Sequence, residues 1–208
     1  MRLCRVHLFR HAEVVGLRGR TCRGQVDVPL SPIGEARSSA AAAWLHAHRP
    51  PPDRVYSSDL SRCLHLARAI HPDPRVSAAL REQDMGTWDG RTWEDLTRED
   101  PAGTSAYWDD YVDARPPGGE SYREVYARVN RWWAEEAPEG QVVIVTHIGV
   151  IRALLCGWMG LGPGQALRWA PDYASHSEVL LAEAGAVIER FGEEVAGTPA
   201  ATPAPAGQ

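Results

Sequence analysis

Short apolar runs that suit β-strands alternate with helical patterns along most of this chain, and this alternation constrains the fold more than any other feature. The clearest run, 141–146, consists almost wholly of β-branched residues, which is typical of a strand buried on both faces. Strands that alternate with helices form a mostly parallel sheet with helices on both faces. The sequence therefore predicts an α/β fold with three layers, an α/β/α sandwich.

The expected elements follow one another along the chain. Ser31 caps a helix whose first position is Pro32, and Ser121 with Glu124 forms a capping box at the start of another. Further helices are expected over 60–70 and 149–161, and short ones in the acidic, tryptophan-rich segment 85–119. Strands are expected at 4–9, 54–57, 75–77, 141–146, 178–182 and 187–191.

The chain has 208 residues, a length that suits one full-sized domain. After Phe191 the composition changes to mainly glycine, proline, alanine and threonine, which favours disorder over a packed core. We therefore expect a single domain over residues 1–191 and a disordered tail over residues 192–208.

Acidic residues outnumber basic ones, 27 to 22, and the formal net charge is −5. Nucleic acids and anionic membrane surfaces require a basic face, so neither is an expected partner. No apolar run reaches the ~18 residues of a membrane span. Arginines also interrupt the N-terminal segment where a secretory signal would need an apolar core. We expect a cytoplasmic protein, and a homodimer stays open as its oligomeric state.

All 22 basic residues are arginine. The absence of lysine excludes Schiff-base chemistry and the lysine of a P-loop, whereas the guanidinium group suits phosphate oxygens. The four cysteines, Cys4, Cys22, Cys63 and Cys156, include no CxxC pair, so we expect buried free thiols rather than a zinc site or a redox motif.

Five chemically active residues follow strands of the predicted sheet. Arg10 and His11 end the first strand, and His147 ends the strand 141–146. Arg62 lies on the first turn after the second strand, and Glu82 follows the third. Ligands of parallel sheets bind at the carboxyl ends of the strands, so one pocket can hold all five.

Two arginines, two histidines and one carboxylate suit phosphoryl transfer without a metal. The arginines and one imidazolium neutralise phosphoryl oxygens, the other imidazole is the nucleophile, and the carboxylate protonates the leaving oxygen. Two other interpretations stay open on the residues alone. Each side chain taken singly is more often structural, and His11 with His147 could instead ligate the metal of a hydrolase.

Several segments together resemble the histidine phosphatase superfamily, whose best-known branch is phosphoglycerate mutase. Residues 8–13 resemble its Arg-His-Gly signature, and residues 55–62 resemble its Ser-Ser-Asp-Leu-x-Arg segment. Residues 80–90 resemble its acid-bearing loop, and residues 145–147 its second histidine. Residues 24–34 and 117–121 match two further segments, and all fall in family order across residues 3–160.

The resemblance implies a role for each of the five residues. His11 becomes phosphorylated, while Arg10, Arg62 and His147 hold the phosphoryl group. Glu82 is the general acid and then the base for the attacking water. No metal or organic cofactor is implied.

Arg23 lies in the loop that borders the phosphate pocket in this family, and it is a further expected phosphate contact. Four positions depart from the family pattern: Ala12, Val14, Leu17 and Ile148. We expect a mild effect from Ala12 provided that its φ is negative, and a narrower pocket from Ile148. None of the four replaces a core residue, so we expect activity to survive.

Mutases of this family carry a long basic insertion between the acid and the second histidine. Here the interval from Glu82 to His147 is short and most of its charged side chains are acidic, which argues against a mutase. The aromatic cap near Trp108 and Tyr111 resembles the α-ribazole phosphatase branch. We expect a metal-independent phosphomonoesterase for a small phosphorylated metabolite, with α-ribazole 5'-phosphate as a candidate. A mutase-type phosphotransferase and an inactive binding module are the alternatives.

Overall fold

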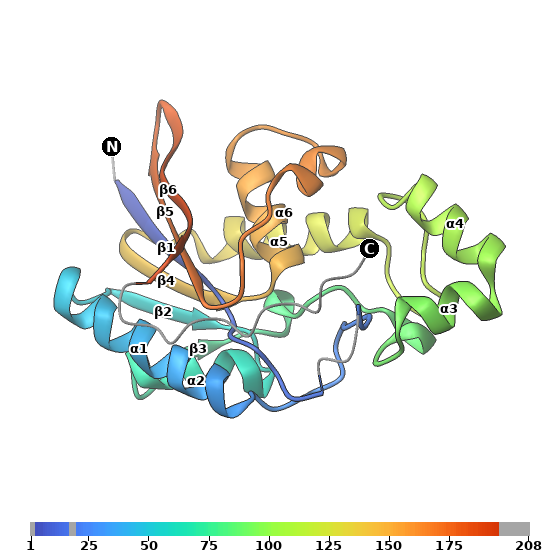
Figure 1. Ribbon diagram of the computed structural model, residues 1–208. Helices are drawn as coiled ribbons and strands as arrows, with labels where there is room; N and C mark the ends of the chain where they lie inside the picture. Colours follow the sequence, from blue (N-terminus) through green and yellow to red (C-terminus); the bar gives the residue numbers. More distant parts are fainter. Residues whose placement is uncertain (1–2, 17–19, 196–208) are drawn as a thin grey trace.

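The computed structural model describes residues 3–16 and 20–195, and Figure 1 shows a twisted sheet with helices packed around it. The strands are β1 (Cys4–Arg10), β2 (Arg54–Ser57), β3 (Arg75–Val76), β4 (Gly140–Thr146), β5 (Ser175–Ala182) and β6 (Gly185–Glu194). The α-helices are α1 (Pro32–His48), α2 (Ser61–Ile70), α3 (Trp93–Glu99), α4 (Pro101–Asp109), α5 (Tyr122–Glu136) and α6 (Ile148–Trp158). Short 3-10 helices η1, η2 and η3 cover Ala78–Leu80, Gly86–Trp88 and Pro163–Arg168.

The strand order within the described residues is β3-β2-β4-β1-β5-β6. The strands β1 to β4 pair in parallel, whereas β5 and β6 form an antiparallel hairpin beside β1. The expected α/β fold with a mostly parallel sheet is confirmed, with this hairpin as the antiparallel part. Parallel pairing brings the carboxyl ends of β1, β2 and β4 to one edge, where the phosphate site was expected.

Strand β4 packs on both of its faces, as its β-branched sequence predicts. Val142 and Ile144 lie in the cluster formed with α5 and α6, and Val143 and Val145 lie in the cluster formed with α1 and α2. All four side chains are fully buried. The sheet is therefore the middle of three layers, with α1 and α2 on one face and α5 and α6 on the other.

The helix starts follow their sequence signals. The Ser31 hydroxyl accepts the backbone N–H of Gly34, and the capping box of Ser121 with Glu124 is complete. The tryptophan-rich segment forms the short helices α3 and α4 beside one edge of the molecule (Figure 1), as expected. Its aromatic side chains pack on one another in a small cluster of their own.

The expected domain end at residue 191 falls within β6, which continues to Glu194. The difference arises because Glu194 pairs with Ser175 of β5, and the Gly192 N–H donates to the Ser177 hydroxyl at 2.9 Å. Val195 is also buried, with 2% of its surface exposed. The remainder of the expected tail, 196–208, lies outside the described residues.

All four cysteines are buried free thiols, as expected. Over the part of the chain that the structure describes, no helix combines the length and apolar character needed to cross a membrane.

Candidate active site

The register of β1 on β4 brings the two site histidines together. Arg10 pairs with Thr146, so His11 and His147 both leave the sheet at the same edge. The His11 backbone N–H donates to the Thr146 carbonyl oxygen at 2.9 Å, which continues the pairing by one residue. The two imidazole rings lie 5.0 Å apart between centroids, at an interplanar angle of 61°.

The His11 ring is held in one tautomer by its own main chain. Its Nδ1 lies 2.8 Å from the carbonyl oxygen of Ala12, so Nδ1 carries the hydrogen and donates it. Nε2 therefore carries no hydrogen, and its lone pair is available. Burial lowers the pKa of His11 well below its usual value, and the charges of Arg10 and Arg62 lower it further. The imidazole is neutral at neutral pH, which a nucleophile requires.

Both ring nitrogens of His147 form hydrogen bonds. Arg62 Nε donates to its Nδ1 at 3.3 Å, so Nε2 carries the hydrogen and donates to the Ser58 hydroxyl at 3.0 Å. The Cys63 sulfur lies 3.4 Å from the same Nε2. Burial, then His11 and Arg62, lower the pKa of His147 well below its usual value, so this ring is neutral as well. One imidazolium was expected among the phosphate-binding groups, whereas burial and the adjacent positive charges favour the neutral form of both rings.

Arg62 is buried at the start of α2 with its fork directed at the loop before α1. Its Nη1 donates to the Val26 carbonyl oxygen at 2.9 Å, and its Nη2 to that of Gly24 at 2.6 Å. These bonds fix the guanidinium plane beside His147. An arginine positioned in this way carries its charge into the site without a carboxylate partner.

Arg10 lies under an aromatic ring that sequence reasoning missed. Its guanidinium carbon is 3.8 Å from the centroid of the Tyr173 ring, and its Nη1 donates to the Pro171 carbonyl oxygen at 2.9 Å. Tyr173 also lies 5.5 Å from the His11 ring between centroids. No local signal in the sequence marks Tyr173, because its contact with Arg10 depends on the path of the chain before β5. Ser58 was also missed as a contact of His147, although it lies in the segment that resembles Ser-Ser-Asp.

The Glu82 carboxylate is held by backbone amides. Its Oε1 accepts the Gln83 N–H at 3.0 Å, and its Oε2 accepts the Gly149 N–H at 3.2 Å, in the first turn of α6. The loop itself is fixed by Arg128, whose Nη2 donates to the carbonyl oxygens of Arg81 and Glu82 at 2.9 and 3.1 Å.

A cavity of about 180 Å³ lies on the Glu82 side of the site. Aromatic and polar residues surround it, among them Arg23, Tyr107, Trp108, Tyr111 and Ile148. Ile148 therefore borders the pocket, as its position beside His147 predicted. Arg23 Nη2 donates to the Gly16 carbonyl oxygen at 2.7 Å, and its buried Nε has no hydrogen-bond partner among the described residues.

The departures from the family pattern fit the structure where it describes them. Ala12 is fully buried and does not have a positive φ, so the missing glycine causes no strain. Val14 is buried and forms a bridge with Leu30. Leu17 lies outside the described residues.

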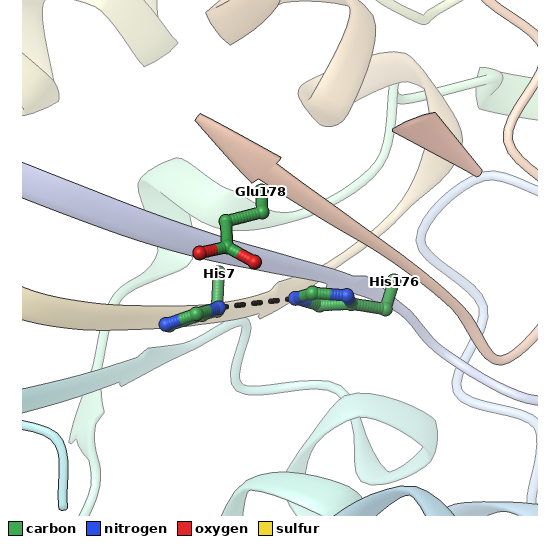
Figure 2. A group of neighbouring side chains, drawn as sticks. All are labelled: His7, His176 and Glu178. Atoms are coloured by element: carbon green, nitrogen blue, oxygen red, sulfur yellow. Dashed lines mark hydrogen bonds between the residues drawn. The ribbon is translucent and has the colours of Figure 1, made fainter. Parts of the chain in front are cut away.

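One group of side chains in the described part of the chain has the spacing of metal ligands: His7, His176 and Glu178, whose ligand atoms all lie within 4.8 Å of one another. Figure 2 shows that the two imidazoles face each other, with His7 Nδ1 3.0 Å from His176 Nε2. The Glu178 carboxylate forms ion pairs with Arg5 and Arg49. Its charge is already balanced and the imidazoles are bonded to each other, so the group suits a structural hydrogen-bond network better than a cation.

The model of the histidine phosphatase superfamily (branch 1) matches residues 6–194. The chain belongs to this superfamily. The glucosyl-3-phosphoglycerate phosphatase of Mycobacterium tuberculosis is 31% identical over 192 residues, covering 81% of this chain and 85% of that protein. The adenosylcobalamin/alpha-ribazole phosphatase of Escherichia coli is 30% identical over 172 residues, covering 78% of this chain and 82% of that protein.

Solved structures of this superfamily share the fold. A putative alpha-ribazole-5'-P phosphatase from Escherichia coli superimposes with a TM-score of 0.85 at 25% identity, covering 94% of this chain and 99% of that one. A mycobacterial glucosyl-3-phosphoglycerate phosphatase superimposes with a TM-score of 0.81 at 26% identity, covering 92% and 99%. Its family and its relatives thus identify this histidine phosphatase as a phosphoric monoester hydrolase.

Proposed function

We propose that this histidine phosphatase hydrolyses a small phosphorylated metabolite through a phosphohistidine formed on His11, without a metal ion. The observation that carries the proposal is the state of His11. Its Nδ1 hydrogen is engaged by the Ala12 carbonyl oxygen, and burial with the nearby arginines keeps the ring neutral. The Nε2 lone pair is thereby available for attack on phosphorus.

In the first step, His11 Nε2 forms a bond to phosphorus while the ester P–O bond breaks. The electron pair of that bond passes to the leaving oxygen, which takes a proton from the Glu82 carboxyl group. Arg10 and Arg62 neutralise the phosphoryl oxygens, and Arg23 adds a further positive charge. The alcohol then leaves through the cavity that Glu82 borders.

In the second step, the Glu82 carboxylate takes a proton from a water molecule as its oxygen attacks phosphorus. The P–N bond breaks and its electron pair returns to Nε2. Inorganic phosphate leaves, and both His11 and Glu82 regain their starting protonation states. His147 keeps its fixed tautomer throughout, because Arg62 and Ser58 hold its two nitrogens.

The substrate class follows from the cavity and from the relatives. A cavity of about 180 Å³ with aromatic walls suits a small organic group rather than a phosphorylated protein. Two relatives are named as phosphatases of alpha-ribazole phosphate and of glucosyl-3-phosphoglycerate, so both compounds belong in a first substrate panel. α-Ribazole 5'-phosphate is the candidate that the resemblance of the aromatic cap suggests, and the panel compares it directly with glucosyl-3-phosphoglycerate.

The test is turnover of p-nitrophenyl phosphate in the presence of a chelator, with His11→Ala and, as a matched control, His65→Ala on the exposed side of α2. We expect wild type and the control to turn over, and His11→Ala to lose turnover. The phosphorylated enzyme, trapped by denaturation during turnover of a labelled substrate, should lose its phosphate label in acid and keep it in alkali.

Loss of turnover on chelation would contradict the metal-independent mechanism. Turnover by His11→Ala, or an acid-stable phosphate label, would contradict the phosphohistidine. No turnover by wild type at any pH would favour an inactive binding module, and exchange of phosphate between two phosphoglycerates would favour a mutase.

A further inference from the structure

Most buried or half-buried arginines in the described residues form an ion pair with a carboxylate, as Arg37 does with Glu13. Within that part of the chain, the ones without an acidic partner are Arg10, Arg23, Arg62 and Arg152. A guanidinium withdrawn from water without a counter-charge is costly, so such a group points to an anionic ligand. The proposed function uses the first three for phosphate and leaves Arg152 without a role.

Arg152 borders the same cavity as Glu82 but projects from a different element. It lies in the second turn of α6, five residues after His147. Its Nε donates to the Trp169 carbonyl oxygen at 2.6 Å, which fixes the side chain and leaves the two terminal nitrogens to bind a ligand. Burial lowers the pKa of Arg10, and the charge of Arg152 lowers it further, so Arg152 lies within electrostatic reach of the phosphate site.

Glu82 is the one carboxylate among the described residues that line the cavity, and it forms no ion pair with Arg152. The Glu82 oxygens accept backbone N–H groups of Gln83 and Gly149 instead. Much of the remaining wall is aromatic, including Trp108 and Tyr111. A ligand that fills this space therefore meets a fixed cation beside apolar surface.

We infer that Arg152 binds a carboxylate on the leaving-group part of the substrate, so that the enzyme prefers phosphate monoesters of hydroxy acids, such as glucosyl-3-phosphoglycerate, over those of neutral alcohols, such as α-ribazole. The two terminal guanidinium nitrogens match the two oxygens of one carboxylate. A single carboxylate also balances the single charge of Arg152. This inference rests on the proposed function, because it places the alcohol portion of the substrate in the cavity beside Glu82.

The experiment compares kcat/KM for 3-phosphoglycerate and for glycerol 1-phosphate, which differ only in a carboxylate against a hydroxymethyl group. Wild type should prefer the carboxylate substrate at least about tenfold, as expected for a charge-assisted bidentate contact. Arg152→Gln should remove most of this preference, and Arg152→Lys should retain part of it. The control is Arg168→Gln, an exposed arginine in η3, which should keep the wild-type ratio.

A wild-type ratio near one would overturn the inference, as would an Arg152→Gln enzyme that keeps the wild-type ratio. A structural role for Arg152 would lower both kcat/KM values together and leave their ratio unchanged. A third substrate, 1,3-propanediol bisphosphate, separates a phosphate subsite from a carboxylate subsite, and a preference for it over 3-phosphoglycerate would overturn the carboxylate assignment. Failure of the proposed function appears separately, as p-nitrophenyl phosphate turnover that does not depend on His11.

Discussion

Alanine at position 149 should displace the Glu82 carboxylate without unfolding the protein. Gly149 donates its N–H to Glu82 Oε2, and a Cβ added there would lie 2.2 Å from Glu82 Oε1. An ordinary contact is 3.4–4 Å, so the carboxylate must retreat by about 1 Å or more. The atom that must move is the end of a flexible side chain, and alanine favours a helix by about 0.5–1 kcal/mol over glycine. The free energy of unfolding should therefore change little.

The catalytic effect should depend on the leaving group. A displacement of about 1 Å can cost about 100-fold in rate, and here the displaced group is the proposed proton donor. Alkyl phosphates have leaving oxygens that need this proton, so their kcat/KM should fall about 100-fold in Gly149→Ala. p-Nitrophenyl phosphate has a good leaving group and should lose far less.

The assay is kcat/KM on both substrates for wild type, Gly149→Ala and Gly162→Ala, together with thermal melting. Gly162 is the matched control, because a Cβ there meets no atom within 4 Å and its φ is −78°. Equal losses on the two substrates, or unchanged turnover of the alkyl phosphate, would refute a proton-donating role for Glu82. A fall of several degrees in Tm would show instead that the substitution disturbs α6.

Three further predictions concern phosphate binding by Arg62, stability at acid pH and the C-terminal end of β6. Arg62→Lys should lower kcat/KM about tenfold or more, since lysine cannot span His147 and two carbonyl oxygens; wild-type kinetics would contradict this. Burial, then His7, lower the pKa of His176 to about 3, so between pH 6.5 and 3 the unfolded chain binds more protons. Stability in urea should fall by up to about 1.4 kcal/mol per pH unit as the pH drops through that range, and His176→Gln should show a shallower slope. Truncation after Val195 should leave Tm nearly unchanged. Truncation after Phe191 removes the paired Glu194 and the buried Val195, so it should lower Tm by about 5 °C. Equal Tm values for the two truncated proteins would show that residues 192–195 do not stabilise the fold.

The sequence by itself determined the class of the fold and the main chemical groups. The β-branched run of β4 needs two apolar faces wherever it lies, so its burial follows from composition alone. Helix caps are equally local, because Ser31 and Ser121 bond to residues three positions away. His11 and His147 could be placed at one edge because parallel strands share the direction of their ends.

Only the tertiary structure decided how those groups are held. The tautomer of His147 depends on Arg62 and Ser58, which come from another strand and helix. The aromatic ring that stacks on Arg10 comes from Tyr173, far along the chain. Neither contact leaves a periodic or capping signal, because each depends on which strands become neighbours.

The same reason explains the two features that sequence reasoning could not supply. Strand β6 continues past residue 191 to Glu194, and Val195 is buried, because pairing with β5, and not the local composition, holds that segment. That Arg152 has no ion-pair partner among the described residues could be recognised only from the structure, which shows that the Glu82 carboxylate accepts backbone N–H groups instead. Composition fixes how many charges a chain carries, whereas long-range packing decides which of them remain without a partner and so face a ligand.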